Sequence, residues 1–200
     1  MKTKRFFLMA GLSLTLTLAL TGCAASPSGL EESAVTVEDS EYVTVGSHLT
    51  VHKTDSRLTL VDHKDALASD GLYYAAWAAG SPEEYENSEG DTVDLYDAQL
   101  YLLLAECKTA EAAEDNRKSW LEAGQANYEV TGEETISCNG QSYTLLTYHF
   151  TNEENPYSHG VSAFGVFENS AICVELTCQE GYSEDLEEML TSFLEGCSYK

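Results

Sequence analysis

The chain has 200 residues, room for one domain of ordinary size with short tails, and 43% of them are apolar, enough for a folded core. Acidic residues outnumber basic ones by 34 to 10, which gives a formal net charge of −24. A surface of that sign repels phosphate backbones and anionic lipid headgroups. We therefore expect no nucleic-acid partner and no electrostatic attachment to a membrane.

The first 22 residues have the three parts of a bacterial secretion signal. Residues 1–5 are basic, and residues 6–20 are uncharged and rich in leucine. This apolar run is shorter than the roughly 20 residues that span a bilayer, which favours a cleaved signal peptide over a stable anchor. The segment ends with Leu20, Thr21, Gly22 and Cys23.

These four residues resemble the lipobox of bacterial lipoproteins. The resemblance implies cleavage between Gly22 and Cys23, and a diacylglyceryl group on the thiol of Cys23. Two acyl chains hold a protein stably at a bilayer, where one chain holds it marginally. We therefore expect a lipid-anchored protein on the extracytoplasmic side of the cell membrane, with the bilayer as its partner through Cys23. Three bases and no acid precede Cys23, so the mature chain has a formal net charge of −27.

Composition divides the mature chain into two parts. Residues 23–46 are small, polar and acidic, which predicts a flexible tether. Residues 42–45 are an alternative first strand, which leaves this boundary open. Residues 47–200 then form a single globular domain.

The first half of that domain predicts strands. Residues 48–53 and 57–62 alternate in polarity around residues 54–56, which indicates a hairpin. Residues 71–79 and 95–107 are apolar on both faces and predict buried strands.

A helix follows them. Thr109 is a typical N-cap residue, and Gly124 is expected to end the helix. One apolar stripe contains Ala110, Ala113, Trp120 and Leu121.

The second half predicts an antiparallel meander and a closing helix. Asn139 and Gly140 are the strongest hairpin signal in the chain, and Asn169 and Ser170 predict the next turn. Ser183 is expected to cap the last helix, which Gly196 ends. The predicted strands are residues 128–137, 142–150, 161–168 and 171–178, and the helix stripe is Leu186, Met189, Leu190, Phe193 and Leu194.

This order predicts an α+β fold, in which two main helices pack on an antiparallel sheet of about six strands. It resembles the PsbP-like α/β/α sandwich in three features: the strand over residues 95–107 that leads into the Thr109 helix, the meander over residues 128–178, and the closing helix. Family members are mostly not enzymes, so the resemblance implies a binding or interaction domain.

Five cysteines follow Cys23, and outside the membrane they are candidates for disulfides. An odd number leaves at least one of them unpaired in a monomer. Cys173 and Cys178 point to opposite faces of one strand, so they are not expected to bond each other. The absence of a C-x-x-C spacing argues against a zinc or redox centre. The candidates are Cys107, Cys138, Cys173, Cys178 and Cys197.

No other motif predicts a catalytic or metal site, and we expect no cofactor. Ser162 falls inside a strand and one residue away from a G-x-S-x-G pattern, so it is a poor nucleophile candidate. A pair of Cys173 and His149 on neighbouring strands is conceivable but has no visible third partner. The five histidines, His48, His52, His63, His149 and His159, are expected on the surface or in hairpins.

Two further groups of residues have alternative interpretations. The acidic segment over residues 81–94 predicts a long solvated loop, and hard oxygens there could instead bind calcium. The aromatic residues favour the core over a sugar- or peptide-binding platform. The acids are Glu83, Glu84, Glu86, Glu89, Asp91, Asp94 and Asp97, and the aromatic residues are Tyr73, Tyr74, Trp77, Tyr96 and Tyr101.

The leading hypothesis is a membrane-anchored extracytoplasmic lipoprotein whose domain binds a protein or small molecule without catalysis. Two alternatives stay open. One is a small extracytoplasmic hydrolase. The other is a receptor for a cation or solute that uses the acidic residues 83–97.

Overall fold

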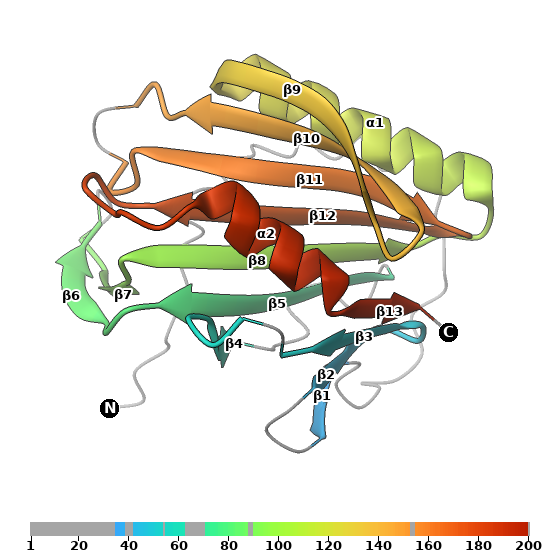
Figure 1. Cartoon of the computed structure of the whole chain (residues 1–200), viewed down its shortest axis with the longest axis horizontal. Helices are drawn as coiled ribbons and strands as arrows, with labels where there is room; N and C mark the ends of the chain where they lie inside the picture. Colours follow the sequence, from blue (N-terminus) through green and yellow to red (C-terminus); the bar gives the residue numbers. More distant parts are fainter. Residues whose placement is uncertain are drawn as a thin grey trace.

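A seven-stranded antiparallel sheet forms the middle layer of the molecule (Figure 1). The computed structural model describes residues 35–38, 42–53, 55–62, 71–87, 90–152 and 155–199. The predicted signal segment, Cys23 and His63 lie outside these ranges. In spatial order the strands are β4 (Thr59–Asp62), β5 (Leu72–Ala79), β8 (Ala98–Glu106), β12 (Ser170–Cys178), β11 (His159–Phe167), β10 (Gln141–His149) and β9 (Glu129–Cys138).

The burial of each strand follows its position in the sheet. The central strands β8 and β12 have no exposed residue, as their continuous apolar sequences predict. Strand β9 is an edge strand and exposes most of its residues. Its acids, Glu129, Glu133 and Glu134, discourage pairing with a second chain along this edge.

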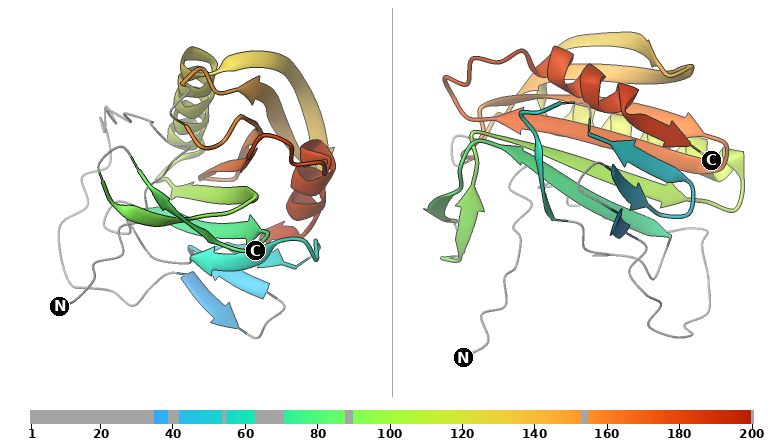
Figure 2. Two further views of the ribbon diagram at one scale, coloured as in Figure 1. Left: turned by 90° about the vertical axis from the view of Figure 1, so that its left-hand side faces the viewer. Right: turned by 60° about the horizontal axis from the view of Figure 1, so that its bottom comes forward.

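The two helices cover opposite faces of this sheet. Figure 1 shows α2 (Leu186–Glu195) in front of the strands and α1 (Ala110–Asn127) behind them, and Figure 2 shows the same layers from two other sides. The five apolar stripe residues of α2 are all buried. These observations confirm the α+β fold with two helices on an antiparallel sheet.

A smaller, four-stranded sheet shares the α2 side. Val43, Val45, Leu49 and Val51 of this sheet belong to the same apolar cluster as the stripe of α2. Two of its strands occupy residues that we expected to belong to the tether, so the ordered chain begins before residue 47, and the alternative of a strand over residues 42–45 was right. In spatial order the strands are β1 (Val35–Glu38), β2 (Tyr42–Val45), β3 (Leu49–His52) and β13 (Cys197–Tyr199).

Two predictions for the first half of the domain are wrong. Strands β3 and β4 do not pair with each other, because β3 lies between β2 and β13 whereas β4 pairs with β5. The predicted acidic loop contains a two-stranded hairpin of β6 (Glu83–Glu86) and β7 (Thr92–Leu95). Tyr85, Val93 and Leu95 alternate with polar residues as in a strand, but the many acids around them favoured the prediction of a loop.

The helix caps and turns differ from the sequence prediction in three places. Helix α1 continues through Gly124 to Asn127, because the three residues after the glycine tolerate a helix. Helix α2 begins at the N-cap Asp185 and not at Ser183, since the Asp185 carboxylate accepts two backbone N–H bonds. The turn between β11 and β12 lies one residue earlier than predicted, so Ser170 is the first residue of β12.

Other predictions at chain reversals are confirmed. Thr109 is the N-cap of α1, and its hydroxyl accepts the backbone N–H of Ala112. Asn139 and Gly140 both have positive φ, 49° and 76°. Gly196 is the C-cap of α2.

Candidate functional site

A buried carboxyl group lies at the centre of the sheet face that α1 covers. Glu175 of β12 has 3% of its surface exposed. Its Oε1 accepts hydrogen bonds from the hydroxyls of Tyr148, of Tyr128 at 3.0 Å and of Ser162 at 3.5 Å. Its Oε2 has no hydrogen-bond partner among the described residues. A buried polar atom in that condition is costly unless something else binds it.

Burial dominates the electrostatics of this centre. Loss of solvent raises the pKa of the Glu175 carboxyl, although the hydrogen bonds from Tyr148, Tyr128 and Ser162 oppose that shift. Burial and the neighbouring carboxylate also raise the pKa of the Tyr128 and Tyr148 hydroxyls. The centre therefore favours the neutral forms of its groups in the absence of a cation.

Oε2 belongs to a residue that lines a crevice between α1 and the sheet. The hollow part measures about 20 Å³, enough for one water-sized group. Its lining is almost entirely apolar in surface, with Glu175 and Ser162 as the polar side chains on the sheet. The residues around it are Leu103, Trp120, Gly124, Tyr128, Ser162, Phe164, Cys173 and Glu175.

Gly124 leaves this space open. A Cβ atom at this position would lie 3.5 Å from Leu146 Cδ1 and 3.6 Å from Phe164 Cζ, which is ordinary contact. An alanine would therefore fit, so close packing does not require the glycine here. Its missing side chain instead accounts for part of the hollow beneath the helix.

The two faces of the sheet differ in chemistry. The α2 side is mostly aliphatic, with Trp77, Tyr143 and Phe193 as its buried aromatic residues. The α1 side contains Tyr74, Tyr101 and Tyr148 together with the buried carboxyl of Glu175. Helix α1 buries only Ala113, Trp120 and Gly124 along its 18 residues. Helix α1 thus buries few of its own side chains against the sheet face that contains Glu175.

The predicted nucleophiles do not form a catalytic pair. Ser162 lies within β11, as predicted, and faces Glu175 and not a histidine. The conceivable pair of Cys173 and His149 does not form, because Cys173 pairs with Phe164 in the middle of the sheet while His149 pairs with His159 at its end. Two residues on neighbouring strands meet only if the strand register places them opposite each other, and the sequence does not give that register.

The structure brings together a different cysteine and histidine. The Cys178 Sγ lies 3.2 Å from Nε2 and 3.7 Å from Nδ1 of His159, and the Ser158 Oγ lies 2.8 Å from that Nδ1. Burial raises the pKa of the Cys178 thiol to about 11 and lowers the pKa of His159. Both shifts favour a neutral thiol and a neutral imidazole, and a reactive thiolate would require the opposite.

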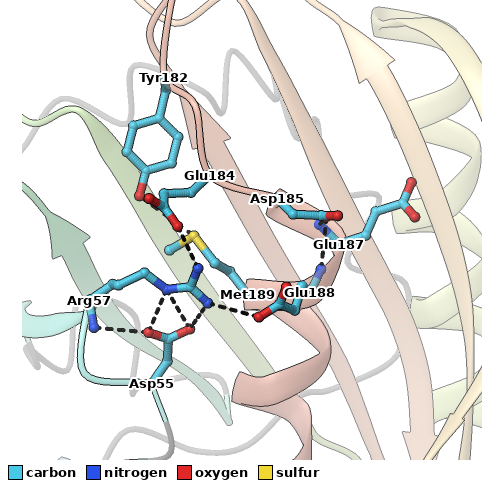
Figure 3. A network of polar contacts seen from close by, with 8 residues as sticks. All are labelled: Asp55, Arg57, Tyr182, Glu184, Asp185, Glu187, Glu188 and Met189. Carbon is cyan, nitrogen blue, oxygen red and sulfur yellow. Dashed lines mark hydrogen bonds and ion pairs between the residues drawn. The ribbon is translucent and has the colours of Figure 1, made fainter.

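An ion-pair cluster ties the β3–β4 connection to the start of α2. Figure 3 shows Arg57 between Asp55 and the acids of the helix. The Arg57 guanidinium lies 2.6 Å from Asp55, 2.8 Å from Glu184 and 3.7 Å from Glu188. Its hydrogen bonds lower the pKa of the buried Asp55 carboxyl. Arg57 is fully engaged in these contacts, so the cluster is structural.

A second hollow lies where the β2–β3 turn, the end of β8 and the β11–β12 turn meet. It has a volume of about 140 Å³ and is lined by polar residues that include His48, Glu106 and Glu168. The backbone N–H and hydroxyl of Ser47 donate to the two carboxylate oxygens of Glu106. Because these oxygens already have partners, the hollow makes a weaker case for a ligand than the crevice at Glu175.

The remaining predicted residues do not converge. The acids of residues 83–97 lie on and around the β6–β7 hairpin, except Glu89, which the structure does not describe. Trp77 and Tyr73 face the α2 side while Tyr74 and Tyr101 face the α1 side, so they form no platform. In the described ranges, no three His, Cys, Asp or Glu side chains could hold a metal ion, and no helix is long and apolar enough to cross a membrane.

Cysteines lie in three separate places. Cys107 is half-buried at the end of β8, and the other four are buried thiols. Cys138 and Cys197 are neighbours at one end of the α2 side. Burial, with a smaller contribution from Cys138, raises the pKa of Cys197 to about 12. Cys173 faces α1. The disulfides stay a prediction, and Cys138 and Cys197 are two candidates that lie close enough to interact.

Comparisons with known proteins concern the fold. No protein-family model matches the chain, and no curated protein matches it. The solution structure of cyanobacterial PsbP (CyanoP) from Synechocystis sp. is similar, with 15% identity, a TM-score of 0.43, and coverage of 90% of this chain and 100% of that chain. A protein from Bacteroides thetaiotaomicron has 9% identity and a TM-score of 0.38, with coverage of 76% of this chain and 45% of its own.

One feature of the sequence indicates the buried carboxyl, although the motifs considered above do not include it. Glu175 is the single charged residue within the otherwise uncharged residues 170–178. A charge in a strand that is buried on both faces must find partners inside the protein. Those partners, Tyr128 and Tyr148, come from other elements, so the sequence alone could not identify them.

Proposed function

We propose that this chain is a lipid-anchored extracytoplasmic protein whose domain binds a ligand, without chemistry, in the crevice between α1 and the sheet. The observation that carries the proposal is the buried Glu175 carboxyl, which lines an aromatic crevice and has one oxygen without a hydrogen-bond partner among the described residues. A narrow apolar pocket with a few convergent polar groups is the usual form of a small-molecule site.

The neutral state of the nearby groups supports binding over catalysis. Nucleophilic catalysis requires an activated thiol or hydroxyl next to a base. Burial raises the pKa of the Cys173 thiol in the crevice, and the same effect acts on Cys178 beside His159. Neither cysteine is activated, so the small-hydrolase alternative has less support.

A ligand screen tests the binding site. Fragments are screened by thermal shift against the chain from residue 24 onward and against Gly124→Leu, whose side chain would fill the crevice. Gly124→Ala, which fits at ordinary contact distance, is the milder variant if the leucine prevents folding. Compounds that stabilise the parent chain should lose most of their effect in the filled variants. If the same compounds stabilise all three proteins equally, the ligand site is elsewhere.

The anchor has its own test. Cys23→Ala removes the thiol that the predicted lipid attachment requires, so this variant should incorporate no fatty-acid analogue and should leave the membrane fraction. Ser26→Ala, three residues further along, is the matched control and should label normally. Equal labelling of the Cys23→Ala variant would overturn the anchoring proposal.

A further inference from the structure

We propose that the ligand of this crevice is a small organic cation, whose ammonium group binds the Oε2 of Glu175 between the rings of Trp120, Tyr128 and Phe164. The inference rests on the proposed function, because it names the ligand class of the same site. Three separate features support a cation: the orphaned oxygen, the aromatic lining and the charge of the whole domain.

When Glu175 is ionised, its Oε2 can only accept, so it requires a hydrogen-bond donor. Tyr128, Tyr148 and Ser162 all donate to Oε1, so none of them satisfies Oε2. An N–H group of an ammonium ion would donate to Oε2 and would balance the buried negative charge. A charged donor makes a shorter and stronger bond than a neutral one.

The crevice walls suit a cation and do not suit an anion. Rings of tryptophan, tyrosine and phenylalanine attract a cation over their faces, and the attraction is largest where water is excluded. The eight lining residues include no lysine or arginine. The strongly acidic domain also raises the local concentration of cations.

The size of the hollow limits the ligand. About 20 Å³ admits one group of the size of water or of a primary ammonium, with any longer chain extending out of the crevice. A quaternary ammonium ion is larger and would require α1 to move. The ligand class is therefore a primary amine in its protonated form.

Binding should be linked to a proton. Burial favours the protonated Glu175, and the ammonium group favours the ionised one. Where Glu175 is protonated, binding releases that proton to solvent and leaves the carboxylate to accept the ammonium N–H. The titratable groups that surround Glu175 are Tyr101, Tyr128, Tyr148 and Cys173, all with raised pKa values. They stay neutral while Glu175 titrates, so the affinity should rise as the pH rises from 5 to 8.

The two tryptophans provide a direct readout. The chain has only Trp77 and Trp120, and they lie on opposite faces of the sheet. Methylammonium chloride is titrated into the ¹⁵N-labelled chain from residue 24 onward, and the two indole N–H signals are followed. The Trp120 signal should shift saturably in the millimolar range, and the Trp77 signal should not. Sodium chloride at equal ionic strength should leave both signals in place.

Variants separate the ligand class from the binding site. Glu175→Gln keeps the shape but removes the charge, and it should weaken methylammonium binding at least tenfold, which is about 1.4 kcal/mol. Glu188→Gln, on the exposed side of α2, is the matched control and should bind as the parent chain does. Unchanged affinity in Glu175→Gln would overturn the proposal.

The remaining outcomes assign failure to one claim or the other. If methylammonium leaves Trp120 unmoved while a neutral fragment such as benzyl alcohol shifts it saturably, the ligand class is wrong and the binding function stands. If tetramethylammonium shifts Trp120 as strongly as methylammonium, the restriction to a primary ammonium is wrong.

Discussion

At the scale of single residues, the main electrostatic feature is the burial of the Glu175 carboxyl. A carboxyl with 3% exposure loses nearly all of its hydration, and three hydroxyl donors on one oxygen replace only part of it. Its neutral form is favoured as a result. Tyr101, whose hydroxyl is also buried without a partner among the described residues, pairs with Glu175 in register on β8.

Glu175→Gln should change the pH dependence of stability. Because the pKa of Glu175 is raised on folding, its penalty is absent below the pKa of an unfolded glutamate, grows as the pH rises from there toward the folded value, and is constant above it. The free energy of unfolding of the glutamine variant, minus that of the parent chain, should therefore be larger at pH 7.5 than at pH 5. Urea unfolding at the two pH values measures this difference. An equal difference between the two proteins at both pH values would contradict the prediction.

Gly140→Val should lower stability through the backbone alone. No atom lies within 4 Å of a Cβ built at Gly140, so a Cβ atom there meets open space. The positive φ of 76° costs a β-branched residue roughly 1 kcal/mol or more. Thermal unfolding should show the loss, and Gly140→Asn should show a smaller one, because asparagine tolerates this conformation. Equal effects of the two substitutions would argue against a backbone cause.

At the scale of elements, the two helices dock by different means. Helix α2 has a continuous apolar stripe, and Phe193 packs edge-on against Trp77 with ring centroids 4.8 Å apart. Helix α1 has one large buried side chain, Trp120, and covers a sheet face where Glu175 and Ser162 lie among apolar and aromatic residues. Helix α2 therefore contributes more to the stability of the fold, while α1 leaves the crevice beside Glu175 unfilled.

Phe193→Ala should be strongly destabilising. Phe193 has 4% of its surface exposed, and removal of a buried ring costs roughly 3–5 kcal/mol in the free energy of unfolding. Glu188→Ala, on the same helix, should change it by less than about 1 kcal/mol, because its contact with Arg57 is long and exposed. Denaturant unfolding of both variants checks the prediction. Small and equal effects would mean that α2 does not dock as described.

At the scale of the whole molecule, the layers decide which thiols meet solvent. Cys107 at the end of β8 is half-buried, whereas the cysteines of β9, β12 and β13 have at most 8% of their surface exposed. Burial also raises the pKa of these four thiols, which lowers the fraction of reactive thiolate.

Native alkylation should therefore modify one cysteine. In the chain from residue 24 onward, iodoacetamide should react quickly with Cys107 alone, as peptide mass spectrometry would show. After denaturation without a reductant, a disulfide between Cys138 and Cys197 would leave both unmodified, whereas free thiols would both be alkylated. Rapid native labelling of Cys173 would contradict the burial of the α1 side.

Local features of this protein could be predicted from the sequence alone. The α2 stripe, the N-cap at Thr109, the Asn139 and Gly140 turn and the buried strands depend on residues close in the chain, so their patterns were readable directly. The class of the fold followed from the order of these elements.

Contacts between distant segments depend on the tertiary structure. Strand β3 pairs with β13 from the other end of the chain and not with β4, and local sequence patterns contain no information on that long-range pairing. Likewise, the crevice combines Gly124 and Tyr128 of the α1 region with Glu175 of β12. The physical reason is strand register: a shift of one residue turns every side chain to the other face, and long-range pairing sets that register.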